Sequence, residues 1–272
     1  MGVLNVTPDS FSDGGRFRSP EDAAGHGLRL FADGADIVDV GGESTRPGGA
    51  ARVDAAEEAR RVVPVIQRLR EQGEGFLSVD TTRAEVARQA LDAGADLVND
   101  VSGFRFDPEM APLVACRGVP AVLMHLRGDF GGMHRQPRYD DVAGEVASEL
   151  RERMAEAGRA GVRPEQVILD PGLGFAKEAA HSLEVLGRLK ELAALQRPLL
   201  LGPSRKSFIG KVLDLPVGER LWGTAAAVAA CVLGGAHLVR VHDVREMAQV
   251  ARLCDAIVNS SSSVAAPVEA RP

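Results

Sequence analysis

The sequence predicts a single α/β domain folded as a (β/α)₈ barrel, with its active site at the C-terminal ends of the strands. Three observations lead to this prediction. Eight short apolar runs alternate with longer helical patterns along the 272 residues, which matches the size and order of such a barrel. Each run is continuous rather than alternating, as expected of parallel strands covered on both faces. Three helix-to-strand junctions also carry nearly the same letters.

The predicted strands are short runs rich in Val, Ile and Leu. In chain order they are Val3–Val6, Ile37–Val40, Phe76–Val79, Leu97–Val98, Ala121–Met124, Val167–Leu169, Leu199–Leu201 and Leu238–Val241. The clearest helix runs from about Asp141 to Gly158, and another from Asp54 to Gln72. Each helix carries apolar residues three or four positions apart, which places them on one face.

The repeated junctions read DGADIVDV (33–40), AGADLVND (93–100) and GGAHLVRV (234–241). In each, a glycine suits the left-handed conformation that ends a helix and lets the chain reverse into the next strand. The competing fold is a doubly wound open sheet. It is less favoured because no glycine-rich dinucleotide fingerprint follows the first strand.

Composition excludes several classes of protein. The net charge of −6 disfavours a nucleic-acid partner. The longest apolar stretch, Ala225–Ala236, is shorter than the roughly 20 residues of a membrane helix, and no signal peptide is recognisable. The three scattered cysteines indicate thiols in a reducing cytoplasm. With no internal linker, residues 1–258 are predicted to form one domain, and 259–272 a disordered tail.

Polar residues end almost every predicted strand. They are Asn5, Asp39, Asp80, Asn99, Asp100, His125, Asp170, Ser204 to Lys206, Arg240 and His242. The C-terminal strand ends of a barrel form one face, and active sites of barrel enzymes are built there. We therefore expect these residues to gather in one site.

The chemistry of this set suggests two kinds of contact. Asp80, Asn99 and Asp170 can accept hydrogen bonds from the donor edge of a flat heterocycle. Lys206, Arg240 and His242 suit an anion, and the start of the helix after Ser204 adds backbone donors for it. The alternative is that the acids and bases only pair with one another in a network that stabilises the fold.

Two loops rich in Gly, Ser, Thr and Asp follow the first two strands, at 7–17 and 41–49. They suggest lids over the barrel mouth, although plain surface loops would have the same composition. The histidines lack the paired spacing of catalytic zinc sites. A hard cation such as Mg²⁺ on phosphate oxygens is the better expectation, but spacing alone cannot establish it.

Seven segments resemble the bacterial dihydropteroate synthases. They are GVLNVTPDSFSDGG (2–15), DIVDVGGESTRPGG (36–49), SVDTTRAEVA (78–87), LVNDVSG (97–103), ILDPGLGFAK (168–177), SRKSFIG (204–210) and VRVHDV (239–244). The resemblance spans residues 2 to about 258. The segment 127–141 receives no assignment, and members of the family usually have further residues before the first strand.

The resemblance implies a pterin-binding enzyme of folate biosynthesis and a sulfonamide target. Such an enzyme joins 4-aminobenzoate to 7,8-dihydropterin-6-ylmethyl diphosphate and releases pyrophosphate and 7,8-dihydropteroate. It also implies Mg²⁺ as cofactor and a homodimer, for which the alanine-rich helix around Thr224 to Leu233 is a candidate surface. Packing of that helix against the barrel explains its composition equally well.

The resemblance also carries roles over to single residues. Asp80, Asn99, Asp170 and Lys206 would hold the pterin, with Met124 packed beside it. Arg240, His242 and Asn5 would hold the diphosphate, with Asn5 also a Mg²⁺ ligand. The aminobenzoate pocket would be formed by Phe11, Thr45, Arg46, Pro47, Phe175 and Ser207. The expected catalytic residues are Lys206, Arg240, His242 and, on the first loop, Asp13.

This reaction needs no protein nucleophile. The leaving diphosphate sits on a methylene beside an electron-rich ring, so C–O cleavage can precede attack by the amine. The protein then mainly neutralises the departing charge and orients the amine. Two rival interpretations are a pterin-binding methyltransferase domain, which would need no diphosphate site, and a non-catalytic pterin-binding homologue.

Overall fold

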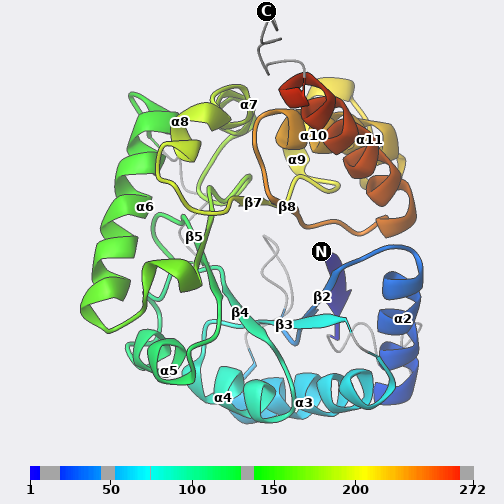
Figure 1. Ribbon diagram of the computed structural model, residues 1–272, viewed down its shortest axis with the longest axis vertical. Coiled ribbons are helices and arrows are strands. Elements are labelled where there is room, and N and C mark those ends of the chain that lie inside the picture. Colours follow the sequence, from blue (N-terminus) through cyan, green and yellow to red (C-terminus); the bar gives the residue numbers. More distant parts are fainter. Residues whose placement is uncertain (7–18, 44–52, 74, 130–137, 264–272) are drawn as a thin grey trace, which may run out of the picture.

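Eight parallel strands form a closed barrel surrounded by helices (Figure 1). The computed structural model describes residues 1–6, 19–43, 53–73, 75–129 and 138–263. The strands are β1 (Gly2–Asn5), β2 (Ile37–Gly41), β3 (Phe76–Asp80), β4 (Leu97–Asp100), β5 (Ala121–Met124), β6 (Val167–Asp170), β7 (Leu200–Leu201) and β8 (Leu238–Val239). The predicted (β/α)₈ barrel is confirmed.

The barrel closes at two bridges between two pieces of sheet. Strands β1 to β6 pair in chain order, and β7 pairs with β8. Parallel bridges link Leu169 to Leu199 and Gly2 to Val241, which joins both ends of the larger piece to the smaller one. All eight strands therefore point the same way, and their C-terminal ends share one mouth.

The helices fill the intervals between strands. They are α2 (Pro20–Ala32), α3 (Ala55–Gln72), α4 (Ala84–Asp92), α5 (Met110–Arg117), α6 (Val142–Arg159), α7 (Ala179–Gly187), α8 (Leu189–Ala193), α9 (Ser207–Leu213), α10 (Leu221–Leu233) and α11 (Val244–Ser263), with 3₁₀ turns at Pro164–Gln166 and Val217–Glu219. Side-chain caps define several starts: Asp54 Oδ1 accepts from the Glu57 amide that opens α3 (2.7 Å). Among the helices within the described ranges, none combines the length and apolar character that a bilayer crossing requires.

Glycines end three helices at the repeated junctions, as predicted. Gly34, Gly94 and Gly235 have φ of 107°, 109° and 98°. Side chains rarely adopt this region, because Cβ approaches the backbone there. The three similar junctions are thus three copies of one reversal from helix to strand.

The strand limits differ from the prediction at both ends of the barrel seam. Leu199 and Val241 were predicted as strand residues, but each contributes only one isolated bridge. Strand β8 ends at Val239, although the Arg240 and Val241 amides still donate to the Leu201 and Met1 carbonyls. Strands β3, β4 and β6 instead run one or two residues further than predicted and include their terminal acids.

Helix α11 continues to Ser263, beyond the predicted end of the domain at residue 258. Local side-chain bonds hold this last turn. Asn259 Nδ2 donates to Asp255 Oδ2 (3.2 Å), and Ser260 Oγ donates to the Ile257 carbonyl (2.8 Å). Residues 264–272 of the predicted tail lie outside the described residues.

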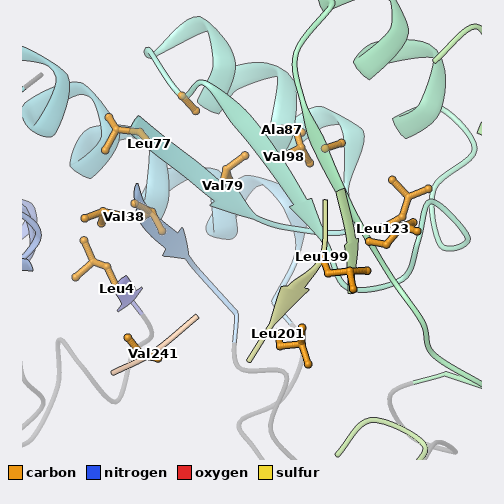
Figure 2. Close-up of a cluster of buried hydrophobic side chains, with 14 of the residues drawn as sticks. Leu4, Val38, Leu77, Val79, Ala87, Val98, Leu123, Leu199, Leu201 and Val241 are labelled. Atoms are coloured by element: carbon orange, nitrogen blue, oxygen red, sulfur yellow. The ribbon is translucent and has the colours of Figure 1, made fainter. Parts of the chain in front are cut away.

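The main core lies between the strands and the surrounding helices. Buried strand residues such as Leu4, Val38, Leu77, Val79 and Leu123 point outward into it (Figure 2). Burial of this apolar surface is the dominant favourable term in folding. The interior of the barrel is thereby left to the alternate residues of each strand, and these form the site.

Candidate active site

An apolar layer inside the barrel lies directly below the candidate site. It is formed by Met1, Ile37, Leu97, Val122, Ile168, Leu200 and Leu238. Side chains two positions further along a strand point to the same face. In five strands those side chains are Asp39, Asn99, Met124, Asp170 and Arg240. The strands therefore direct four polar or charged groups and one methionine to the same end of the barrel.

The strand register sets neighbouring site residues at one level. Asn5 pairs with Gly41, Gly41 with Asp80, and Asp80 with Asn99. These residues end or nearly end β1 to β4. Residues distant in sequence thus form a row across four adjacent strands, as expected when parallel strands end at one edge.

Arg240 binds two carboxylates in the middle of the barrel mouth. Its Nε donates to Asp39 Oδ2 (2.6 Å), and its Nη2 donates to Asp80 Oδ2 (2.8 Å). Asn99 Nδ2 donates to the same Asp39 oxygen (3.0 Å). Burial raises the pKa of Asp80, and the positive charge of Arg240 opposes this. The ion pairing that the sequence analysis kept as an alternative is therefore present at Arg240.

Asp39 was expected at the strand-end site but received no substrate contact, yet it bonds both Arg240 and Asn99 in this network. It is 0 % exposed, and its Oδ1 has no hydrogen-bond partner among the described residues. A buried oxygen without a donor is costly, which points to a donor or cation supplied by a ligand. The sequence indicates this role through one acid inside the apolar run IVDV (37–40). An acid in a buried strand needs a partner for its charge.

Asp170 and Lys206 lie in the other half of the site. Burial raises the pKa of Asp170 to about 6, against the opposing effects of the Gly172 N–H and of Lys206. That N–H donates to Asp170 Oδ1 at 2.7 Å. Lys206 Nζ lies 4.1 Å from the centre of the Phe175 ring. Met124 pairs in register with Asp170 and packs in a small apolar cluster that includes Phe175.

The segments after β7 and β8 are joined by two cross-links. His242 Nδ1 lies 2.9 Å from Ser204 Oγ, which also accepts from the His242 backbone N–H (3.2 Å). Arg205 forms an ion pair with Asp243, with Nε donating to Oδ2 at 3.0 Å. Ser207, the first residue of α9, is exposed beside them. The segment before α9 is thus bonded to the segment after β8.

Five predicted site residues lie outside the described residues. They are Phe11 and Asp13 in the segment 7–18, and Thr45, Arg46 and Pro47 in the segment 44–52. The residues that flank the second segment, Glu43 and Val53, both bond the side chain of Arg83. Arg83 bonds the Glu43 carboxylate (2.8 Å) and the Val53 carbonyl (2.6 Å), and it also pairs with the buried Glu58.

The predicted Mg²⁺ is compatible with the donor atoms at the mouth. Within the described ranges, no cluster of three or more His, Cys, Asp or Glu side chains could hold a metal. Mg²⁺ is often bound by only one or two protein oxygens when phosphates complete its shell. A Cβ on Gly41 would lie 3.7 Å from Asn5 Oδ1 and 3.6 Å from Asp80 Oδ2, so both oxygens lie beside the same glycine. An amide oxygen and a carboxylate oxygen are donors that a hard cation prefers, and Arg240 also bonds the carboxylate oxygen.

Comparison with known proteins gives one consistent result. The family model described as pterin binding enzyme matches residues 1–242. The dihydropteroate synthase of Synechocystis is 51 % identical over 258 residues, which cover 94 % of this chain and 89 % of that protein.

Solved structures agree with the sequence matches. A Yersinia pestis dihydropteroate synthase in a sulfonamide drug complex has a TM-score of 0.90 and 39 % identity, covering 95 % of this chain and 94 % of that one. The Xanthomonas albilineans enzyme in complex with 7,8-dihydropteroate has a TM-score of 0.84 and 41 % identity, covering 98 % and 94 %.

Proposed function

Because the chain belongs to the dihydropteroate synthases of the pterin-binding enzyme family, we propose that its barrel mouth binds a pterin ring, an aminobenzoate and a diphosphate in three adjoining regions. The protein is a transferase of folate biosynthesis that joins 4-aminobenzoate to 7,8-dihydropterin-6-ylmethyl diphosphate. These three regions are assigned because the side chains of Asp39, Asp80, Asp170 and Arg240 meet above one apolar layer.

The pterin region consists of Asp80, Asn99, Asp170, Lys206 and Met124. Asp170 supports this role best, because it is a buried carboxylate that accepts from the Gly172 backbone N–H through Oδ1. A carboxylate that accepts two parallel N–H bonds both binds and orients a flat heterocycle. Met124 and the apolar layer below supply contacts for the ring faces.

The aminobenzoate region is built around Phe175 and Ser207, with Phe11, Thr45, Arg46 and Pro47 contributed by the loops after β1 and β2. Lys206 lies over the Phe175 ring and so borders both this region and the pterin region. A cation and an aromatic ring suit an aromatic amine that bears a carboxylate. Sulfonamides have a similar size and polarity, so the same region accounts for this enzyme being a sulfonamide target.

The diphosphate region consists of Arg240, His242 and Asn5. Arg240 has five N–H donors, and its two carboxylate partners take two of them. The Ser204 hydroxyl accepts from the His242 backbone N–H, so it can donate its own proton to Nδ1 and keep the proton of a neutral ring on Nε2. Asn5 would hold Mg²⁺, which supplies charge neutralisation on phosphate oxygens.

The proposed mechanism relies on charge placement and orientation. Arg240 and His242 stabilise the negative charge that develops as the C–O bond to diphosphate breaks. Asp80, Asn99 and Asp170 hold the ring while positive charge spreads into it. The Phe175 region presents the amine to the methylene carbon, and the amine proton leaves after the C–N bond forms. No covalent intermediate on the protein is needed.

Replacement of Lys206 by alanine tests the assignment of the site. We expect kcat/KM in a pyrophosphate-release assay to fall by about 100-fold or more, because a charge bordering two substrate regions is lost. Thermal stability should change little, since Lys206 is only half-buried. Lys211→Ala, at an exposed lysine on α9, is the matched control and should retain activity.

The assay is run with both substrates, with and without added Mg²⁺, and with each substrate omitted. Release of pyrophosphate that requires 4-aminobenzoate supports the proposal. Full activity of Lys206→Ala would contradict the role of this residue, and equal activity after chelation would contradict the Mg²⁺ site.

We also propose a cytoplasmic homodimer. Its surface is the apolar face of α9 to α11, which exposes Val212, Leu213, Trp222, Leu253 and Ile257. Trp222 is 81 % exposed, whereas Thr224, Ala227, Val228 and Cys231 of the same helix are buried. The alanine-rich part of α10 thus packs on the barrel, and its neighbours offer the free surface. The three free cysteines suit a reducing compartment.

Sedimentation velocity tests the dimer. Trp222→Glu is expected to shift the protein from dimer to monomer, because a charge buried without a partner is costly at an apolar interface. Phe76→Glu, at a residue 61 % exposed outside this face, should leave the dimer intact. A monomeric wild-type protein at micromolar concentration would contradict the proposal.

A further inference from the structure

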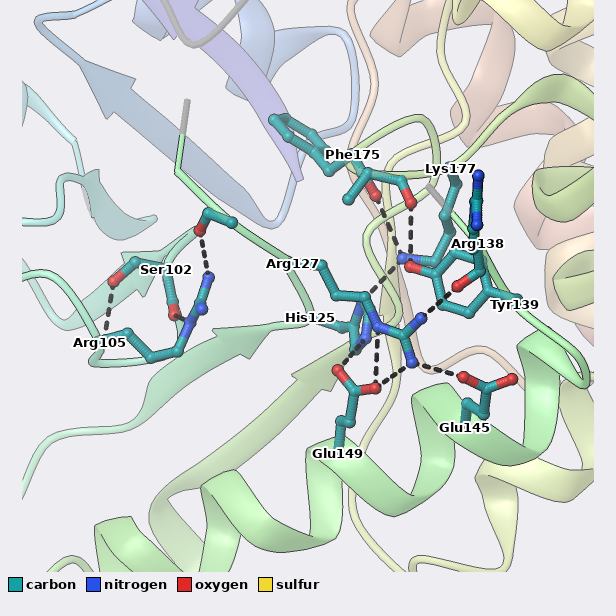
Figure 3. Close-up of polar contacts among 12 residues, drawn as sticks. Ser102, Arg105, His125, Arg127, Arg138, Tyr139, Glu145, Glu149, Phe175 and Lys177 are labelled. Atoms are coloured by element: carbon teal, nitrogen blue, oxygen red, sulfur yellow. Dashed lines mark hydrogen bonds and ion pairs between the residues drawn. The ribbon is translucent and has the colours of Figure 1, made fainter. Parts of the chain in front are cut away.

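A buried lysine beside the site is used by none of the three substrate regions. Lys177 Nζ lies 2.8 Å from His125 Nδ1 and donates to the carbonyl of Phe175 (3.2 Å), as Figure 3 shows. The side chain is almost completely buried, with 6 % of the residue exposed. A buried ammonium is costly unless its protons are bonded, so these two acceptors define its position.

The protons of this cluster can be assigned from geometry. If Lys177 donates to His125 Nδ1, the ring proton is on Nε2, which lies 3.0 Å from Glu149 Oε2. Arg127 Nε then donates to the other Glu149 oxygen (2.9 Å). Burial and the charge of Lys177 lower the pKa of His125 to about 4, in agreement with a neutral ring. Lys177, His125 and Arg127 therefore form one chain of hydrogen bonds that ends on Glu149.

The cluster encloses a strained turn. Ala176, between Phe175 and Lys177, has φ of 46°, a left-handed conformation that residues with a side chain rarely adopt. Such a conformation persists only where its surroundings impose it. The Phe175 carbonyl accepts from Lys177, and the Ala176 carbonyl accepts from the Tyr139 hydroxyl (2.9 Å). Two side chains thus hold two successive carbonyls of this turn.

Arg127 supports both of these side chains. Its guanidinium lies over the Tyr139 ring at 4.0 Å, and the same group pairs with Glu149, which bonds His125. Arg127 also bonds Glu145 of α6 and the carbonyl of Arg138 (both 2.6 Å). The described part of segment 127–141, which had no role assigned from sequence, therefore contacts the turn directly through Tyr139.

The turn also packs closely on β5 and β6. A Cβ on Gly172 would lie 2.2 Å from the His125 carbonyl oxygen, so only glycine fits there. The Phe175 N–H donates to the Gly172 carbonyl (3.0 Å). The backbone of Phe175 is therefore held in place, and its ring lies under Lys206.

We propose that Lys177 and Tyr139 are positioning residues for 4-aminobenzoate, which hold the strained turn at Ala176 so that the Phe175 ring stays in the aminobenzoate region. This inference rests on the proposed role of Phe175. It predicts a specific kinetic effect, because Lys177 and Tyr139 bond the carbonyls of Phe175 and Ala176, whereas Asp170 of the pterin region is held by the Gly172 N–H.

Tyr139→Phe is the main test, because it removes one hydroxyl and keeps the ring under Arg127. We expect the KM for 4-aminobenzoate to rise by about 5-fold or more, while the KM for the pterin diphosphate changes less than 2-fold. Lys177→Met should also raise the KM for 4-aminobenzoate, but because the charge of Lys177 acts on Asp170 as well, the split between the two KM values is judged on Tyr139→Phe. Lys177→Met can also impair folding. If Lys177→Met is unstable, the inference is judged on Tyr139→Phe alone.

Two further variants complete the experiment. Glu145→Gln weakens a different bond of Arg127 and should leave both KM values unchanged. Phe175→Ala tests the proposed function itself and should raise the KM for 4-aminobenzoate. If Phe175→Ala has no such effect, the role of Phe175 is wrong and the inference falls with it. If Phe175→Ala raises that KM but Tyr139→Phe does not, or raises both KM values equally, the inference alone is overturned.

Discussion

Asp170→Asn is expected to lower kcat/KM by about 100- to 1,000-fold and, at neutral pH, to make the fold more stable. The loss of activity follows from the hydrogen bonds that the ring region requires. A bond to a charged group contributes about 1.5–3 kcal/mol, and two parallel bonds are involved. Asparagine keeps one oxygen, which still accepts from Gly172, but presents an NH₂ group where the carboxylate accepted donors.

The gain in stability follows from the raised pKa of Asp170. Burial raises it from 3.8 to about 6. A carboxyl group whose pKa is higher in the folded than in the unfolded protein stabilises the fold while it is protonated. This contribution is present in full below the pKa of the unfolded state, and it is lost as the pH rises through the pKa of the folded state. Ionised Asp170 therefore costs up to about 3 kcal/mol above pH 6. Asparagine removes this cost, so the advantage of the variant should be small near pH 4 and grow toward pH 8.

Urea unfolding at several pH values, together with the pyrophosphate assay, measures both effects. Asp100→Asn is the matched control for activity. Asp100 is also fully buried, and burial also raises its pKa to about 6, but it accepts from the Ser102 and Phe104 amides of its own loop. Its replacement should leave kcat/KM within about threefold, because it makes no contact with substrate in the proposed site. An Asp170→Asn enzyme with wild-type activity would contradict the ring contact.

The barrel could be predicted because its signal is local and repeated. Each strand is a short apolar run, and Gly34, Gly94 and Gly235 mark three helix ends with the same backbone requirement. The seam was harder to predict. Strands β7 and β8 have two paired residues each, and their limits depend on contacts with β6 and β1, far away in the sequence. The end of α11 was missed because serines carry little helical signal of their own.

The general location of the site could also be predicted, since polar residues that end parallel strands meet at one mouth. The pairing among them could not. Arg240 bonds Asp39 across 201 positions, and Lys177 contacts His125 across 52. Such partners are chosen by barrel closure and side-chain direction rather than by spacing. The sequence therefore left pairing between these acids and bases as an alternative, but it did not identify Asp39 and Asp80 as the partners of Arg240.

Because it breaks the ion pairs with Asp39 and Asp80, Arg240→Ala should lower the free energy of unfolding by about 3–5 kcal/mol. It should also weaken the binding of the diphosphate. Removal of the guanidinium leaves Asp39, which is 0 % exposed, and Asp80 without their cation. Arg245→Ala is the matched control. Arg245 pairs with Asp33 at an exposed position, so its loss should cost less than about 1 kcal/mol.

A double-variant comparison separates the stability role of Arg240 from its substrate role. In Asp39→Asn/Arg240→Ala the buried charge next to Asn99 is gone, so urea unfolding should show a recovery of at least about 1 kcal/mol relative to Arg240→Ala. Lower pH should act in the same direction in the single variant, because burial raises the pKa of Asp80, so this carboxylate takes up a proton as the pH falls. Activity should recover in neither case, since neither change restores a donor for the diphosphate. If Arg240→Ala is as stable as the wild type, the carboxylates do not depend on this cation, and the pair is not what holds the mouth together.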